Sequence, residues 1–228
     1  MPENPEAIGQ DSLLFDAREA IRATTTLTAE DAAARTEEGR VGPASHALHR
    51  AGMSLDVNRA ALVIIDPQVN FSTSSGPHHD VAELRTVQNL ARLAKATKLV
   101  GIPLAVSLTA PRELHSDVIP ALKSYVEDHK AIICWPHVML KQFWVNDIGL
   151  RLRQQQITQI ILAGMFVSLR IETHLRDFIE QGFEVVVVTD AVAGAKLPEG
   201  IGYLSALANF RRIVDALWTT DETIQKLR

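Results

Sequence analysis

The chain has 228 residues, of which 46% are hydrophobic and 22% are charged, and its formal net charge at pH 7 is −4. This composition is typical of a soluble globular protein, and the length suits one domain with a substantial core plus an additional segment. The negative charge argues against nucleic-acid binding. Because no apolar run approaches the ~20 residues of a membrane span, we also expect a cytoplasmic protein without a membrane partner.

The first 53 residues are predicted to be an N-terminal extension to a domain that spans residues 54–228. Residues 24–31 resemble a helix N-terminus, with threonines followed by acidic residues, but the segment lacks a dense apolar stripe. Its first residues are polar and acidic, so we expect no signal peptide. The extension is therefore predicted to be partly helical or disordered, or to pack on the domain or on a neighbouring subunit.

The domain itself is predicted to alternate strands and helices. Apolar runs predict strands at residues 60–65, 102–108, 131–134, 159–163, 184–189 and 213–218. Helical spacing predicts helices around residues 87–94, 147–155, 171–179 and 200–209. This alternation predicts a three-layer α/β fold, with a doubly wound, mostly parallel sheet and helices on both faces. The run at 60–65 should be central and the run at 159–163 should lie beside it, because both are apolar on both faces.

Two segments at predicted strand ends carry a pattern that points to a family. The first is Ile65-Asp66-Pro67-Gln68-Val69-Asn70-Phe71, and the second runs from Ile160 through Gly164 and Arg170 to Phe178, followed by an acidic turn at Thr189-Asp190-Ala191. Ligands bind beyond the carboxyl ends of the strands in such sheets, which is where Asp66 and the turn after Gly164 fall. The pattern resembles the isochorismatase-like (cysteine hydrolase) superfamily over about residues 55–227. The resemblance implies that superfamily's α/β fold and hydrolase chemistry on a small molecule.

The resemblance assigns a role to Asp66 and raises a question at position 170. It implies that Asp66 is the general acid/base. A carboxylate just beyond a buried strand is partly desolvated, which suits that role. The position that corresponds to the family's catalytic cysteine holds Arg170, which is neither a thiolate nor a general base. Arg170 is predicted either to bind an anionic substrate group at a helix start capped by Ser168, or to form an ion pair with Asp66 that fills the site.

The family's catalytic lysine has two candidates in this sequence. Gapless counting back from Gly164 places His137 at the lysine position, whereas Lys141 takes that position only if the loop is shorter than usual. The sequence leaves both residues open.

Several side chains are predicted to surround the substrate. The aromatic candidates are Phe71, Trp135, Phe143, Trp144 and Phe166, and Ser168 joins them at the predicted helix start. The family resemblance also implies a cis peptide bond between Met165 and Phe166. Cys134 is predicted to be a buried strand residue rather than the missing nucleophile. No spacing of metal ligands is evident, so we expect neither a metal nor a cofactor.

Taken together, the sequence predicts an isochorismatase-family, hydrolase-like enzyme with an altered catalytic triad. We expect non-cysteine acid/base chemistry at Asp66 on a small, anionic metabolite. The alternative is a catalytically inactive family member that serves as a ligand-binding or assembly subunit. By resemblance we also expect a homodimer or a higher homo-oligomer.

Overall fold

A computed structural model gives the fold of most of the predicted domain. It describes residues 53–69, 83–108, 117–128, 131–135, 146–194, 196–197 and 200–228. The predicted extension therefore lies outside the described residues, apart from Met53. None of the described helices combines the length and apolar character that a membrane-spanning helix needs.

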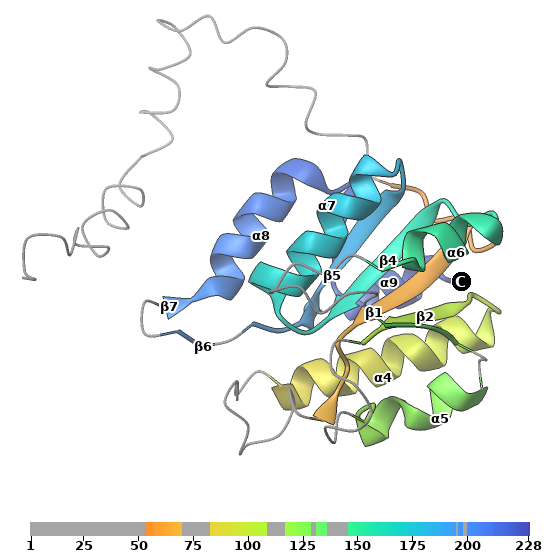
Figure 1. Cartoon of the computed structure of the whole chain (residues 1–228), viewed down its shortest axis with the longest axis horizontal. Helices are drawn as coiled ribbons and strands as arrows, with labels where there is room; N and C mark the ends of the chain where they lie inside the picture. Colours follow the sequence, from red (N-terminus) through yellow and green to blue (C-terminus); the bar gives the residue numbers. More distant parts are fainter. Residues whose placement is uncertain are drawn as a thin grey trace, which may run out of the picture. The chain divides into compact units, whose positions relative to one another are not determined.

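The core of the domain is a six-stranded parallel sheet (Figure 1). Its strands are β1 (Ala60–Ile65), β2 (Leu104–Ser107), β3 (Ile132–Cys134), β4 (Gln159–Gly164), β5 (Glu184–Val192) and β8 (Ala216–Trp218). They are ordered β3-β2-β1-β4-β5-β8, so β1 is central and β4 lies beside it, as the sequence predicted. A separate two-stranded pair, β6 (Lys196–Leu197) and β7 (Gly200–Ile201), was not predicted.

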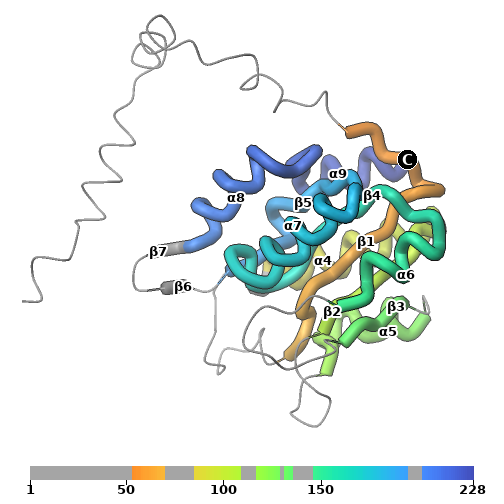
Figure 2. The backbone as a smooth tube through the Cα atoms, turned by 45° about the horizontal axis from the view of Figure 1, so that its top comes forward, coloured from red at the N-terminus to blue at the C-terminus, as the bar shows by residue number. Residues whose placement is uncertain are grey.

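Helices cover both faces of the sheet (Figure 1). One face carries α4 (Glu83–Leu99), α5 (Pro120–Asp128) and α9 (Thr220–Lys226), and the other carries α6 (Ile148–Gln154), α7 (Glu172–Glu180) and α8 (Gly202–Ile213). Helices α7 and α8 lie side by side in both views of the chain (Figure 2). The three-layer, doubly wound architecture is therefore confirmed.

Strand β1 shows why the sheet needs both helical layers. Along it, Ala60, Leu62 and Ile64 join one hydrophobic cluster, and Ala61, Val63 and Ile65 join the other. Every residue of β1 and of β4 is buried. A strand that is buried on both faces must be apolar throughout, which is why the two uninterrupted runs in the sequence become neighbouring central strands.

The sheet order places the topological switch point between β1 and β4. The chain proceeds from β1 outward to β2 and β3, then returns to the other side of β1 to form β4 and continues outward through β5 and β8. The connections therefore leave β1 and β4 in opposite directions. In open α/β sheets, ligands bind beyond the carboxyl ends of the strands at such a switch point.

Candidate active site

The candidate site lies at the carboxyl ends of β1 and β4. Ile65, the last residue of β1, is in register with Gly164, the last residue of β4. Asp66 follows β1 directly, and Arg170 follows β4 within a π-helix that spans Val167–Ile171. Residues 104 positions apart in the sequence thus converge at the switch point of the sheet.

The backbones of the two strand ends are packed closely together. The amide of Met165 donates a hydrogen bond of 2.9 Å to the carbonyl of Ile65. A Cβ atom on Gly164, whose φ is +130°, would lie only 2.1 Å from that same carbonyl oxygen. Residue 164 must therefore be glycine, and its lack of a side chain brings the turn that follows β4 against the end of β1.

Asp66 and Arg170 form a buried ion pair. The Nε of Arg170 donates to Oδ2 of Asp66 over 2.8 Å, and the Asp66 side chain is 0% exposed and that of Arg170 5% exposed. Of the two arrangements that the sequence left open for Arg170, the structure contains the ion pair. Asp66 also has a φ of +48°, a conformation that costs a non-glycine residue roughly 1–2 kcal/mol. The amide of Asp66 donates to the carbonyl of Ser107 and its carbonyl accepts from the amide of Gln68, each over 2.8 Å, and these bonds support the conformation.

A chain of buried polar side chains adjoins the pair. Nδ2 of Asn146 lies 2.7 Å from Oγ of Ser107, that Oγ lies 3.1 Å from Nε2 of His174, and Nδ1 of His174 lies 2.9 Å from the backbone carbonyl of Arg170. Burial and the positive charge of Arg170 lower the pKa of His174 to about 4. His174 is therefore neutral at pH 7.

This polar chain was not predicted from the sequence. Its members come from β2, from α7 and from the turn before α6, and no local motif joins them. One signal was available, because His174 interrupts an otherwise apolar face and lies four residues after Arg170, which is one helical turn.

The other predicted site residues are only partly described. Trp135 and Phe166 are half-buried and pack against the hydrophobic cluster on the α4 face of the sheet. Phe71, His137, Lys141, Phe143 and Trp144 lie outside the described residues. The choice between His137 and Lys141, and most of the predicted lining, therefore stay predictions.

Two local expectations near Gly164 are wrong. Ser168 does not cap the helix: it is exposed and lies inside the π-helix, whose N-cap residue is Phe166. The Met165–Phe166 peptide bond is trans, as are the other described peptide bonds, and Phe166 instead adopts a left-handed conformation with a φ of +60°. The π-helix runs directly into α7, so nothing in the sequence indicated that the residues up to Ile171 form a π-helix rather than an α-helix.

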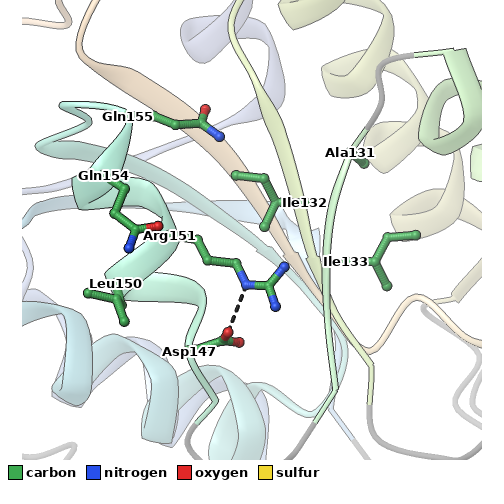
Figure 3. Close-up of a pocket in the computed structure, with 8 residues that line it drawn as sticks. All are labelled: Ala131, Ile132, Ile133, Asp147, Leu150, Arg151, Gln154 and Gln155. Carbon is green, nitrogen blue, oxygen red and sulfur yellow. Dashed lines mark hydrogen bonds and ion pairs between the residues drawn. The ribbon is translucent and has the colours of Figure 1, made fainter.

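Cys134 is the last residue of β3, and a pocket of about 580 Å³ lies between β3 and α6 (Figure 3). Burial, followed by the charge of Asp147, raises the pKa of Cys134 to about 12, so its thiol is protonated at neutral pH. The pocket contains the Asp147–Arg151 ion pair of 2.7 Å. Its lining residues are Ala131, Ile132, Ile133, Asp147, Leu150, Arg151, Gln154 and Gln155. Neither Asp66 nor Arg170 is among them.

A metal centre is not evident in the part of the chain that the structure describes. Those residues contain no group of three or more His, Cys, Asp or Glu side chains that could hold an ion. The expectation that the protein uses no cofactor stays a prediction.

Comparisons with known proteins identify the family. The model of the isochorismatase domain matches residues 60–216. YecD of Escherichia coli O157:H7, an uncharacterized isochorismatase family protein, is 25% identical over 163 residues, which are 63% of this chain and 84% of YecD.

Solved structures share the fold. A cysteine hydrolase from Pseudomonas syringae pv. phaseolicola 1448A superposes with a TM-score of 0.68 at 19% identity, over 79% of this chain and 96% of that one. The YcaC gene product of Escherichia coli, an octameric hydrolase of unknown specificity, has a TM-score of 0.59 at 21% identity, over 78% and 83% of the two chains. The chain belongs to the isochorismatase family.

Proposed function

We propose that this protein is a hydrolase-like enzyme that acts on a small, anionic metabolite without a covalent thioester intermediate. Family membership supports the class of reaction. The observation that carries the chemistry is the Asp66–Arg170 ion pair at the switch point of the sheet. The resemblance assigns the nucleophile position to Arg170, and an arginine cannot accept a proton. Of these two described side chains, Asp66 is therefore the one that can accept a proton.

The ion pair suits a carboxylate that acts as a general base. The guanidinium of Arg170 lies 2.8 Å from Oδ2 of Asp66 and holds this carboxylate at the strand end. A carboxylate is one of the side-chain groups that act as general bases. An ionised Asp66 would take a proton from a water molecule, and that water would then attack the substrate. A general base of this kind contributes roughly 10²–10⁴-fold to the rate.

The same pair supports the proposed anionic substrate. Arginine carries five N–H donors in a planar fork that matches a carboxylate or phosphate group. The Nε edge of Arg170 faces Asp66. An anionic substrate group would approach the guanidinium from another edge of the fork, and this would place the reacting bond near Asp66. His137 or Lys141 would add a second positive charge if either takes the family's lysine role.

Burial of the pair is also compatible with a second candidate function. Asp66 is fully buried, and a buried, mutually neutralised pair also suits a family member that binds a ligand or assembles with other subunits but does not catalyse. Turnover separates the two candidates.

The test is a hydrolysis screen with matched variants. The panel consists of small carboxylated amides, esters and vinyl ethers, and it is applied to the wild type, Asp66→Asn, Cys134→Ser and Glu180→Gln. We expect turnover of at least one compound, a loss of about 100-fold or more in Asp66→Asn, and activity near that of the wild type in the other two variants. Glu180→Gln makes the same carboxylate-to-amide change on the exposed side of α7.

Two results would count against the proposal. Equal turnover by Asp66→Asn and the wild type would remove Asp66 from the mechanism. Binding of panel compounds in calorimetry without any turnover would establish the second candidate instead.

We also propose that the protein is a homodimer or a higher homo-oligomer. The octameric state of YcaC, whose fold this chain shares, supports this assembly.

A further inference from the structure

We propose that Asn146, Ser107 and His174 form a directed hydrogen-bond chain that positions the Asp66–Arg170 pair. The chain deepens the function proposed above and rests on it, because it matters for chemistry only if Asp66 and Arg170 are the functional pair. Its members are positioning residues, since the contacts argued below reach the backbone of the pair.

The direction of the chain follows from the chemistry of its members. The Nδ2 group of Asn146 can only donate, so Oγ of Ser107 accepts that bond. The single hydroxyl proton of Ser107 is then directed to Nε2 of His174, which must be unprotonated to accept it. The proton of the neutral imidazole therefore resides on Nδ1, from which it is donated to the carbonyl of Arg170. One assignment of hydrogens satisfies all three contacts.

Burial makes that assignment the favoured state. Ser107 is 0% exposed, His174 is 1% exposed and Asn146 is 6% exposed. A buried polar group without a hydrogen bond is costly, so the opposite tautomer, which would place two donors against Ser107 and none against Arg170, is disfavoured. The low pKa of His174 agrees, because a protonated ring would carry donors on both nitrogens beside the positive charge of Arg170.

The chain reaches the ion pair at the backbone of both partners. At one end, the carbonyl of Arg170 accepts the Nδ1 proton of His174. In the middle of the chain, the carbonyl of Ser107 accepts a hydrogen bond of 2.8 Å from the amide of Asp66. The residue that sits in the middle of the polar chain therefore also fixes the backbone of Asp66, whose positive φ requires outside support. The backbones of Asp66 and Arg170 are thus both bonded to members of the same hydrogen-bond chain.

The geometry of the imidazole allows a matched pair of variants. In His174→Asn the side-chain amide lies near the place of Nδ1 and keeps a donor for the carbonyl of Arg170. In His174→Gln the amide lies near the place of Nε2, so it keeps the contact with Ser107 and loses the contact with Arg170. A positioning role predicts different results for the two variants, whereas a merely structural role predicts similar ones.

The experiment measures the solvent exchange of the Arg170 Nε proton by NMR, assigned with Arg170→Lys. In the wild type this proton is protected, because it is bonded to buried Asp66. We expect His174→Gln to accelerate its exchange about tenfold, which corresponds to the loss of one buried hydrogen bond, and His174→Asn to keep the wild-type rate. Thr97→Val is the control, because it removes a buried hydroxyl that bonds Leu93 and Ala94 on the opposite face of the sheet.

The nitrogen resonances of His174 provide a second, independent readout. The wild-type spectrum should show a protonated Nδ1 and an unprotonated Nε2. Ser107→Ala removes the hydroxyl that donates to Nε2 of His174 and leaves the backbone in place. We therefore expect a shifted Nε2 resonance and faster exchange of the Arg170 Nε proton, even if His174→Gln does not fold.

Equal exchange rates in the Asn and Gln variants, or acceleration by Thr97→Val as large as that by His174→Gln, would overturn the positioning role. A wild-type spectrum with the proton on Nε2 would overturn the direction of the chain. Neither readout uses turnover, so failure of the proposed hydrolysis would leave these results intact and would be recognised separately.

Discussion

At the scale of single residues, Arg170 and Asp66 explain each other. A guanidinium that is 95% buried needs a counter-charge, because an unpaired charge away from water costs several kcal/mol. Asp66 supplies that charge within one hydrogen bond. Arginine at the position that the resemblance assigns to the nucleophile is therefore compatible with the fold, because Asp66 supplies its counter-charge.

Ionisation of His174 should make the stability of the protein depend on pH. Its pKa is about 4 in the folded protein, against 6.5 for an ordinary histidine, so the unfolded chain takes up a proton first as the pH falls. The contribution of His174 to the unfolding free energy is fully present above about pH 6.5. It decreases as the pH falls from 6.5 to 4, and below pH 4 this residue causes no further loss. The difference of 2.5 pH units corresponds to about 3 kcal/mol.

Urea unfolding of the wild type and of His174→Gln at several pH values measures this effect. The difference in unfolding free energy between the two proteins should shrink by about 3 kcal/mol from pH 7 to pH 4, since the variant lacks the titrating group. A difference that stays constant over this range would show that His174 is not buried in its neutral form.

At the scale of elements, the approach of β4 to β1 fixes the site. A comparison of Gly164 with Gly101 distinguishes the effect of strand packing from the effect of backbone conformation. Both glycines have a positive φ, but of the two only Gly164 has neighbouring atoms in the space that a Cβ would fill. We expect Gly101→Ala to lower the unfolding free energy by about 1 kcal/mol. Gly164→Ala should lower it by more than about 3 kcal/mol, since Ile65 backbone atoms cannot move without disturbing both strands.

Thermal and urea unfolding of the two variants provide the comparison. Losses of similar size would mean that the turn after β4 can move away from β1, and the rigid placement of Arg170 beside Asp66 would then be wrong.

The sequence predicts the sheet better than the helical layers. Strands β1 and β4 are continuous apolar runs, and their central place follows from burial on both faces. Helix α5 was missed because only Leu122 and Val126 of its nine residues are buried, which leaves a weak stripe. Helix α9 could have been found, because Thr219 and Glu222 form a capping box that is visible in the sequence.

The candidate site divides in the same way. Asp66 and Arg170 follow from strand ends and from the family pattern, both of which are local in the sequence. Their hydrogen bond was one of two alternatives, since sequence cannot show how a flexible arginine is oriented. The contact of His174 with Ser107, by contrast, depends on tertiary packing between α7 and β2, because the two residues are 67 positions apart.

At the scale of the whole molecule, assembly is the main open prediction. We expect light scattering at micromolar concentration to give a particle of at least twice the 25.1 kDa of one chain. A variant that lacks residues 1–52 would show whether the predicted extension contributes to association. A monomeric mass for the full chain across this concentration range would reject the homo-oligomer.

The central claim is that Asp66 and Arg170 meet in a buried ion pair where the family resemblance places its catalytic groups. A double-mutant cycle in urea unfolding, with Asp66→Asn, Arg170→Met and the double variant, tests it most directly. We expect each single change to cost about 3–5 kcal/mol, because it leaves the other partner buried without its counter-charge. The double variant should cost at least about 2 kcal/mol less than the sum of the two. Additivity within about 0.5 kcal/mol would show that the two side chains do not interact. It would contradict the ion pair and the proposed function that depends on it.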